Sequence, residues 1–219
     1  MENGYHMSAS EPDHQETGRP TRLLLVRHGQ IAANVDQRWH GSTDEDLTDH
    51  GREEARRVAA YVASTHPHVA SVYTSPAQRA RNTAALIATA LGLGLRVVPE
   101  LAEYGIGVLE KELYADLAGR HRFFELSEAD LTWAPAGGES LSAVGTRVVA
   151  AWRTISGEQA GAEVVVVSHG AAIAAGLASL LHADPRGWPR YHVKNASVTE
   201  IEVTPVPRVV RFNVVDHLG

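Results

Sequence analysis

The chain has 219 residues, of which 44% are hydrophobic and 21% charged, as is typical of a globular protein. Its formal net charge of −6, with no block of consecutive lysines and arginines, argues against nucleic acid or an acidic membrane as a partner. Because the sequence contains no cysteine, disulfides, thiolate catalysis and cysteine-bound metals are excluded.

Residues 1–20 are polar and nearly free of aliphatic side chains, which predicts a disordered tail. The His6-Met7 pair resembles a cloning junction, so we expect part of this tail to be a tag. No basic and apolar leader opens the chain, and no apolar run approaches the roughly 20 residues that span a bilayer. We therefore expect a cytoplasmic protein in which residues 21–219 form one domain.

The first half of this domain alternates between apolar runs of strand length and segments of helical periodicity. Residues 23–26 form an unbroken apolar run, which is typical of a strand buried on both faces. Thr48 can cap a first long helix, and a second strand covers residues 69–73. Pro76 sits where the next helix can begin, and a third strand covers residues 95–98.

Residues 104–138 interrupt this alternation. They contain a short helical pattern at 111–117 and a loop rich in proline and glycine, so we predict a small helical insertion over one end of the sheet. A helix over 140–155, a strand over 164–167 and a helix after Gly170 then restore the alternation.

Two runs rich in β-branched residues, 197–203 and 209–215, close the chain. The link between them is too short for a helical crossover, so this pair is predicted to be antiparallel. The earlier strands and helices imply a mostly parallel sheet covered on both faces. The predicted fold class is therefore α/β, a three-layer α/β/α sandwich whose mostly parallel sheet has an antiparallel edge strand.

Polar residues of a few chemical kinds follow the predicted strands. In open α/β sheets, ligands bind outside the carboxyl ends of the strands, so these residues are expected to meet at one rim. Two histidines, two arginines and one carboxylate stand there, namely Arg27 with His28, Arg79, Glu103, and His169 with Gly170. Such a set suits the binding of a phosphate monoester.

Phosphoryl transfer needs positive charge on the phosphoryl oxygens, an in-line nucleophile and a proton for the leaving group. Arginine suits the first role because its guanidinium group binds phosphate in a bidentate manner and stays charged. Arg27 and Arg79 are the natural pair, and Asn34 can add neutral donors.

The remaining roles fall to the histidines and the carboxylate. A neutral His28, with its other ring nitrogen held by a backbone carbonyl, can attack phosphorus and form a phosphohistidine. His169 can stabilise the transferring group, while Glu103 can protonate the departing oxygen and then activate water. Gly29 and Gly170 let the backbone approach the phosphate closely.

Several blocks of the sequence resemble the histidine phosphatase superfamily, the group related to cofactor-dependent phosphoglycerate mutase. They occur in the order of the family and span nearly everything after the tail. The blocks are Leu-Leu-Leu-Val-Arg-His-Gly-Gln with Asn34, Leu47-Thr48 with Gly51, Thr74-Ser75-Pro76 with Arg79, Leu101 with Glu103, Gly107 and Glu110, Gly138-Glu139-Ser140, Val167-Ser168-His169-Gly170, and His217-Leu218.

The resemblance implies an enzyme of the phosphatase branch that uses neither metal nor cofactor, with the insertion lying over its active site. His28 is then the phosphorylated nucleophile and Glu103 the proton donor. The implied catalytic set is His28, Glu103, His169, Arg27 and Arg79. The implied substrate-binding set is Arg27, Gln30, Asn34, Arg79, His169 and Gly170, with His40, Tyr104 and Lys111 as further candidates.

The sequence departs from the family's pattern at three positions. Ile31 stands where a threonine is usual, Lys111 where glycine is common, and His40 where a glutamine is frequent. None of these changes removes a catalytic group, but Lys111 and His40 put the usual substrate preference in question.

Several candidates also have a purely structural interpretation. Glu103 could be a solvated loop acid, with Glu100 or Glu110 acting in its place, and Asn34 could be a turn residue. The Phe123-Phe124 pair is of a kind that more often packs, although it could also contact the substrate. The 12 histidines show no His-Glu-x-x-His spacing, so zinc is a minor hypothesis.

Three functions are compatible with these residues. The leading one is a phosphomonoesterase that hydrolyses a small phosphorylated metabolite, because the chain is short for a mutase with a water-excluding lid. The alternatives are a phosphoglycerate mutase-type phosphotransferase and a non-catalytic protein that binds a phosphorylated ligand. The late strands could also offer an edge for pairing in a homodimer.

Overall fold

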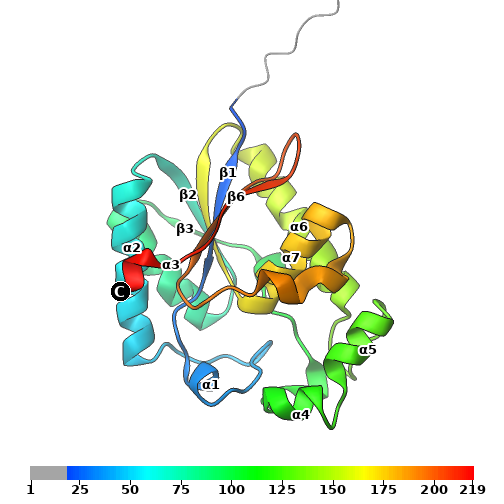
Figure 1. Cartoon of the computed structure of the whole chain (residues 1–219). Helices are drawn as coiled ribbons and strands as arrows, with labels where there is room; N and C mark the ends of the chain where they lie inside the picture. Colours follow the sequence, from blue (N-terminus) through cyan, green and yellow to red (C-terminus); the bar gives the residue numbers. More distant parts are fainter. Residues whose placement is uncertain (1–18) are drawn as a thin grey trace, which may run out of the picture.

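The computed structural model of this chain describes residues 19–219 and contains a six-stranded sheet with helices on both sides (Figure 1). The predicted tail and tag lie outside the described residues, apart from residues 19 and 20. The strands are β1 (Arg22–Arg27), β2 (Val69–Thr74), β3 (Leu95–Val97), β4 (Glu163–Ser168), β5 (Val198–Glu202) and β6 (Arg208–Val214).

The strand order β3-β2-β4-β1-β5-β6 places β4 and β1 at the centre of the sheet. The first four strands of this order pair in parallel, as predicted. β5 runs against β1, and β6 pairs antiparallel with β5 at the edge, as the short link between them predicted. The one strand of opposite direction, β5, therefore lies one position in from the edge.

The central strands are apolar along their whole length because both of their faces are covered. In β1, Leu23 and Leu25 belong to one core cluster, while Leu24 and Val26 belong to the other. Successive side chains of a strand point to opposite faces, so an unbroken apolar run requires a layer on each side.

Four helices supply these two layers, with α2 (Asp49–Thr65) and α3 (Gln78–Leu91) on one face and α6 (Leu141–Glu158) and α7 (Gly170–His182) on the other (Figure 1). The predicted three-layer sandwich is confirmed. Thr48 caps α2 as predicted, because its Oγ1 accepts a hydrogen bond from the Gly51 amide at 2.9 Å. Within residues 19–219, none of the helices combines the length and apolarity needed to cross a bilayer.

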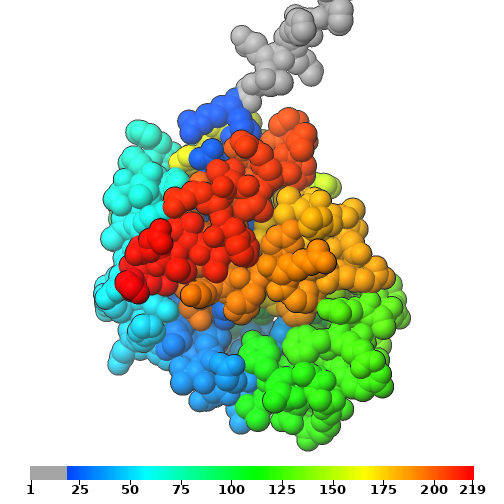
Figure 2. All heavy atoms as spheres, viewed as in Figure 1, coloured from blue at the N-terminus to red at the C-terminus, as the bar shows by residue number. Residues whose placement is uncertain are grey.

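The segment after β3 forms two short helices, α4 (Tyr114–Ala118) and α5 (Phe123–Ala129), where one helix at 111–117 was predicted. They lie beyond the end of the sheet at which β1 finishes (Figure 1). Five further short elements are α1 (Ala32–Val35) and the 3₁₀ helices η1 (Pro99–Leu101), η2 (Gly107–Leu109), η3 (Pro185–Tyr191) and η4 (Asp216–Leu218). In the space-filling view, the surfaces around α1, α4, α5 and η3 meet at this end of the molecule (Figure 2).

Candidate active site

The register of the sheet brings the two histidines of the sequence motifs together. β1 and β4 pair so that Arg27 lies opposite Ser168, and His28 and His169 each follow directly. The His28 amide donates to the Ser168 carbonyl at 3.1 Å, which extends the ladder by one bond. The two imidazole rings meet edge to face, with 5.1 Å between their centroids.

His28 is held as a neutral imidazole with one free nitrogen. Its Nδ1 lies 2.7 Å from the Gly29 carbonyl oxygen, and because that oxygen can only accept, the proton is on Nδ1. Burial, followed by the charges of Arg79 and Arg27, lowers the pKa of His28 well below its usual range. Nε2 therefore keeps its lone pair, as a nucleophile requires.

His169 is fully buried and held by a serine from the neighbouring strand end. Its Nε2 lies 2.7 Å from the Ser75 hydroxyl, which can donate to it and so leave the proton on Nδ1. Burial, Arg79 and His28 lower the pKa of His169 well below its usual range. Burial and positive charge therefore favour the neutral form of both imidazoles.

Arg79 organises a neighbouring loop from the first turn of α3. Its guanidinium donates to the carbonyls of Thr43 at 2.9 Å, Gly41 at 3.0 Å and His40 at 3.1 Å. These bonds use the two terminal nitrogens and leave Nε of this fully buried side chain without a protein partner among the described residues.

Arg27 is anchored from the other side of the site. One terminal nitrogen donates to the Val193 carbonyl at 2.7 Å, and a Cβ added at Gly170 would lie 3.4 Å from the guanidinium carbon. That distance is an ordinary van der Waals contact, so the structure has room for a Cβ at position 170.

Three buried nitrogens beside His28 have no hydrogen-bond partner among residues 19–219, namely Nε of Arg27, Nε of Arg79 and Nδ1 of His169. Buried polar groups of native proteins are nearly always paired. The charges of both arginines lower the pKa of both histidines. A tetrahedral oxyanion would supply the acceptors that these donors lack.

Glu103 lies at the amino end of α7. Its carboxylate accepts hydrogen bonds from the amides of Ala172 at 2.8 Å, Tyr104 at 2.8 Å and Ala171 at 3.1 Å. The other two acids of this region are placed differently. Glu110 accepts from the Gly41 amide at 2.8 Å and Glu100 is exposed, so of the three only Glu103 lines the pocket described below.

Asn34 is tied to the backbone of His28 through a residue that sequence reasoning missed. The Asn195 amide group donates to the His28 carbonyl at 3.0 Å and to Oδ1 of Asn34 at 3.1 Å. Asn195 stands outside the sequence blocks considered above, and only the antiparallel return of β5 beside β1 places it there.

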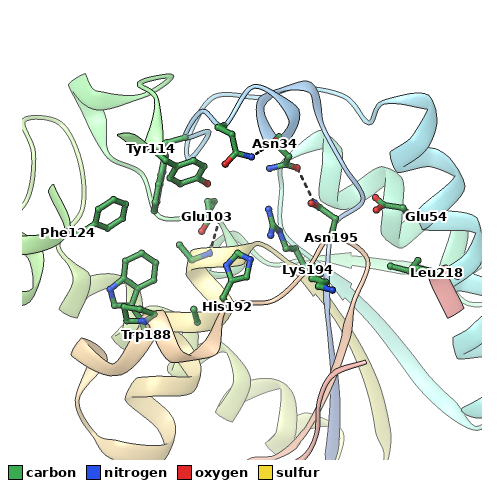
Figure 3. Close-up of a pocket in the computed structure, with 17 residues that line it drawn as sticks. Asn34, Glu54, Glu103, Tyr114, Phe124, Trp188, His192, Lys194, Asn195 and Leu218 are labelled. Atoms are coloured by element: carbon green, nitrogen blue, oxygen red, sulfur yellow. Dashed lines mark hydrogen bonds between the residues drawn. The ribbon is translucent and has the colours of Figure 1, made fainter. Parts of the chain in front are cut away.

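A pocket of about 910 Å³ opens beside these groups (Figure 3). Of the predicted site residues, Arg27, Asn34, Glu103 and Gly170 line it, while His28, His169 and Arg79 lie behind this wall and are at most 3% exposed. The lining residues that were not predicted include Gln37, Trp39, Glu54, Tyr114, Trp188, His192, Lys194 and Asn195, and Phe124 lines it too.

Besides Arg79 and His169, four more of the predicted substrate-binding residues do not line this pocket. Gln30 accepts from the Thr48 hydroxyl at 3.0 Å, and His40 lies 3.5 Å from Glu45. Tyr104 is buried in the core, while its neighbour Glu103 lines the pocket. Lys111 is an exposed turn residue.

Lys111 occupies a backbone conformation that explains the glycine common at this position in the family. Its φ is +68°, in the left-handed region, and its amide donates to the Trp39 carbonyl at 2.9 Å. Among the residues that the structure describes, no cluster of three or more His, Asp or Glu side chains is placed to hold a metal ion.

The fold and the site define a class of α/β protein in which paired imidazole and guanidinium groups gather at the carboxyl ends of a parallel sheet. Residues 23–214 match the family described as histidine phosphatase superfamily (branch 1). The chain belongs to this superfamily.

Curated relatives and solved structures with different names share most of the chain. It is 34% identical over 196 residues to the glucosyl-3-phosphoglycerate phosphatase of Mycobacterium tuberculosis, covering 84% of this chain and 86% of the relative. It is 30% identical over 200 residues to a protein of Yersinia enterocolitica named probable phosphoglycerate mutase GpmB, covering 90% and 92%. The structure of phosphoserine phosphatase from Entamoeba histolytica with 3-phosphoglyceric acid superposes with a TM-score of 0.82 at 26% identity, covering 91% of this chain and 100% of that chain.

Proposed function

We propose that this protein is a phosphomonoesterase that hydrolyses a small organic phosphate through a phosphohistidine at His28. The observation that carries the proposal is the set of three unpaired buried nitrogens around an imidazole whose Nε2 is unprotonated. Buried donors that lack acceptors favour the binding of an anion. A neutral imidazole beside that anion can act as the nucleophile.

In the first step, Arg27, Arg79 and His169 bind the non-bridging oxygens of the phosphate. The Nε2 lone pair of His28 attacks phosphorus, so that a P–N bond forms while the bond from phosphorus to the leaving oxygen breaks. Glu103 gives its proton to that oxygen, and the alcohol departs.

In the second step, Glu103 takes a proton from a water molecule whose oxygen attacks phosphorus. The P–N bond breaks and its electron pair returns to Nε2 of His28. Inorganic phosphate leaves, and Glu103 again carries the proton needed for the next cycle. The Gly29 carbonyl holds Nδ1 in both steps, which keeps the ring in one orientation.

The names of the relatives support the hydrolase and keep the mutase as the alternative function. Phosphatase names occur for a relative and a solved structure that both cover most of the chain, and a mutase name occurs at similar identity. The site has the same residues for either outcome, because a mutase returns the phosphoryl group to a second hydroxyl where a phosphatase transfers it to water.

The test is turnover of p-nitrophenyl phosphate in EDTA, together with trapping of the phosphoenzyme by a quench in alkaline detergent. We expect phosphate release that a chelator does not inhibit and a base-stable, acid-labile phosphoprotein. His28→Ala should lose both signals, while His68→Ala, which changes an exposed histidine, should lose neither. Full activity in His28→Ala would end the proposal.

Two further readouts separate the alternatives. Isomerisation of 3-phosphoglycerate that outpaces its hydrolysis would establish the mutase. Binding of inorganic phosphate without turnover of any phosphate ester would establish the non-catalytic protein. The cytoplasmic location and the homodimer stay predictions.

A further inference from the structure

The pocket has two unlike walls. One wall, here called the aromatic lobe, consists of Trp39, Tyr114, Phe124, Trp188, Ala174 and Pro189. Phe124 stacks on Trp188 with 6.0 Å between centroids, and Trp39 meets Tyr114 edge to face at 5.7 Å. Elements far apart in the chain, α4, α5 and η3, therefore meet to form one continuous apolar surface.

The opposite wall is polar and includes Asn34, Glu54, Lys194 and Asn195. In Figure 3, Phe124, Tyr114 and Trp188 lie on one side of Glu103, and Lys194, Asn195 and Glu54 lie on the other. The organic group of a bound ester can therefore contact either an apolar or a polar surface.

The position of Glu103 decides which surface the organic group contacts. If Glu103 protonates the leaving oxygen, that oxygen lies beside its carboxyl group, and the organic group continues from there. Tyr114 and Glu103 both line the pocket, and Figure 3 shows Tyr114 on the aromatic side of this carboxylate. The leaving group is therefore released next to Tyr114 and into the aromatic lobe.

The aromatic lobe offers no fixed positive charge. None of its members is a lysine or arginine, and burial, followed by the charges of Arg27 and Lys194, lowers the pKa of His192 beside it. A carboxylate carried by the leaving group would lose its hydration there without a partner, whereas an apolar ring would bury its surface favourably.

We propose that this enzyme selects phosphate esters whose organic group is uncharged and either aromatic or bulky and apolar, and that Phe124 and Trp188 are specificity-determining residues. The inference rests on the proposed phosphatase function, since it assigns the leaving group to the Glu103 side. Carboxylate-bearing esters such as 3-phosphoglycerate and O-phosphoserine are poor substrates by the same argument.

The test compares 2-phenylethyl phosphate, ethyl phosphate and O-phosphoserine. The first two release alcohols of similar acidity, so a difference between them reports contact with the phenyl ring rather than chemical reactivity. Burial of one phenyl ring predicts a kcat/KM for the phenylethyl ester about 10–100-fold above that of ethyl phosphate. A higher kcat/KM for O-phosphoserine than for 2-phenylethyl phosphate would overturn the proposal.

Variants locate the effect. Phe124→Ala should reduce the ratio of the two kcat/KM values, phenylethyl over ethyl, by about 5–20-fold. Phe212→Ala, which removes a ring that packs against Tyr191 away from the pocket, should leave the ratio unchanged. An equal ratio in wild type and Phe124→Ala would show that the ring binds elsewhere.

A binding experiment keeps this inference distinguishable from the proposed function. Phosphonates are not hydrolysed, so calorimetry with 2-phenylethylphosphonate and ethylphosphonate measures the aromatic lobe without turnover. Tighter binding of the phenyl compound, by about 10-fold or more and weakened in Phe124→Ala, supports the lobe even if no ester is hydrolysed. Equal affinity for both phosphonates, with turnover of esters intact, would refute the proposed role of the aromatic lobe. The proposed phosphatase function would still hold.

Discussion

The imidazole rings of His28 and His169 lie edge to face with 5.1 Å between their centroids, and neither ring is more than 3% exposed. Two protonated rings at this distance would repel each other beside Arg27 and Arg79. The pKa of each is accordingly lowered well below its usual range, by burial first and then by neighbouring positive charge.

This pair makes the stability of the protein depend on pH in a predictable direction. A histidine in the unfolded chain has a pKa of about 6.5. Below that pH these two histidines bind protons in the unfolded chain but not in the folded protein. The contribution of the pair is therefore complete above about pH 6.5 and is lost as the pH falls toward the lowered folded values. Each histidine adds a slope of about 1.4 kcal/mol per pH unit.

Urea unfolding between about pH 7 and pH 5 measures this slope. His169→Gln should reduce the slope of stability against pH by the contribution of one histidine. His68→Gln, at an exposed position, should leave the slope unchanged. Identical slopes for wild type and His169→Gln would show that His169 is protonated equally in both states.

Ser75→Ala tests how His169 is positioned. The change removes the partner that lies 2.7 Å from Nε2 and leaves a buried ring nitrogen unsatisfied, so we expect a loss of about 1–3 kcal/mol in the free energy of unfolding. Because the ring can then turn, kcat should fall about 10-fold with a smaller change in KM. Ser64→Ala, on an exposed part of α2, is the matched control, and a kcat equal to wild type in Ser75→Ala would contradict the role.

Asn195 offers a chemically sharper experiment. Asn195→Asp keeps the shape but replaces the donor of the two bonds to the His28 carbonyl and Asn34 by an acceptor, which repels both oxygens. We expect kcat/KM to fall by about 10-fold or more, and further than in Asn195→Ala, where the repulsion is absent. Steady-state kinetics with p-nitrophenyl phosphate compare kcat/KM of the wild type and the two variants. A higher kcat/KM in Asn195→Asp than in Asn195→Ala would contradict the role of Asn195 as a donor to His28 and Asn34.

Lys111→Gly should stabilise the protein. The left-handed φ of +68° strains any residue with a Cβ, and removing that strain outweighs the greater freedom of glycine in the unfolded chain by about 0.5–1 kcal/mol. Thermal unfolding measures the gain. Lys111→Ala removes the charge but keeps the Cβ, so a similar gain in that variant would assign the effect to charge instead.

Two glycine substitutions distinguish close approach from simple flexibility. A Cβ at Gly29 would lie 2.3 Å from the Gly51 carbonyl oxygen, so Gly29→Ala must displace the loop that carries His28. We expect a loss of about 1–3 kcal/mol in stability and a large loss of kcat/KM. Gly94→Ala, where nothing lies within 4 Å, should be neutral or slightly stabilising in the same assays.

Local pattern was sufficient for much of the fold. Apolar runs and helical spacing predicted the six strands, the four long helices and the antiparallel final pair, all of which the structure contains. α5 was missed, since a short helix that buries only Phe123 and Ser127 shows little periodicity. Boundaries shifted by a few residues, as at α3, which begins at Gln78 rather than near Pro76.

The sequence by itself determined which residues gather at the rim, because parallel strands joined by right-handed crossovers bring their carboxyl ends to one edge wherever they stand in the chain. Tertiary structure alone decided which way loop side chains point, so that Glu103 faces the pocket while Tyr104 enters the core. It also decided the contact of Asn195 with His28 and the joining of α4, α5 and η3 into an aromatic wall. Such contacts depend on the paths of irregular segments and on desolvation by distant residues, and neither has a periodic signature in the sequence.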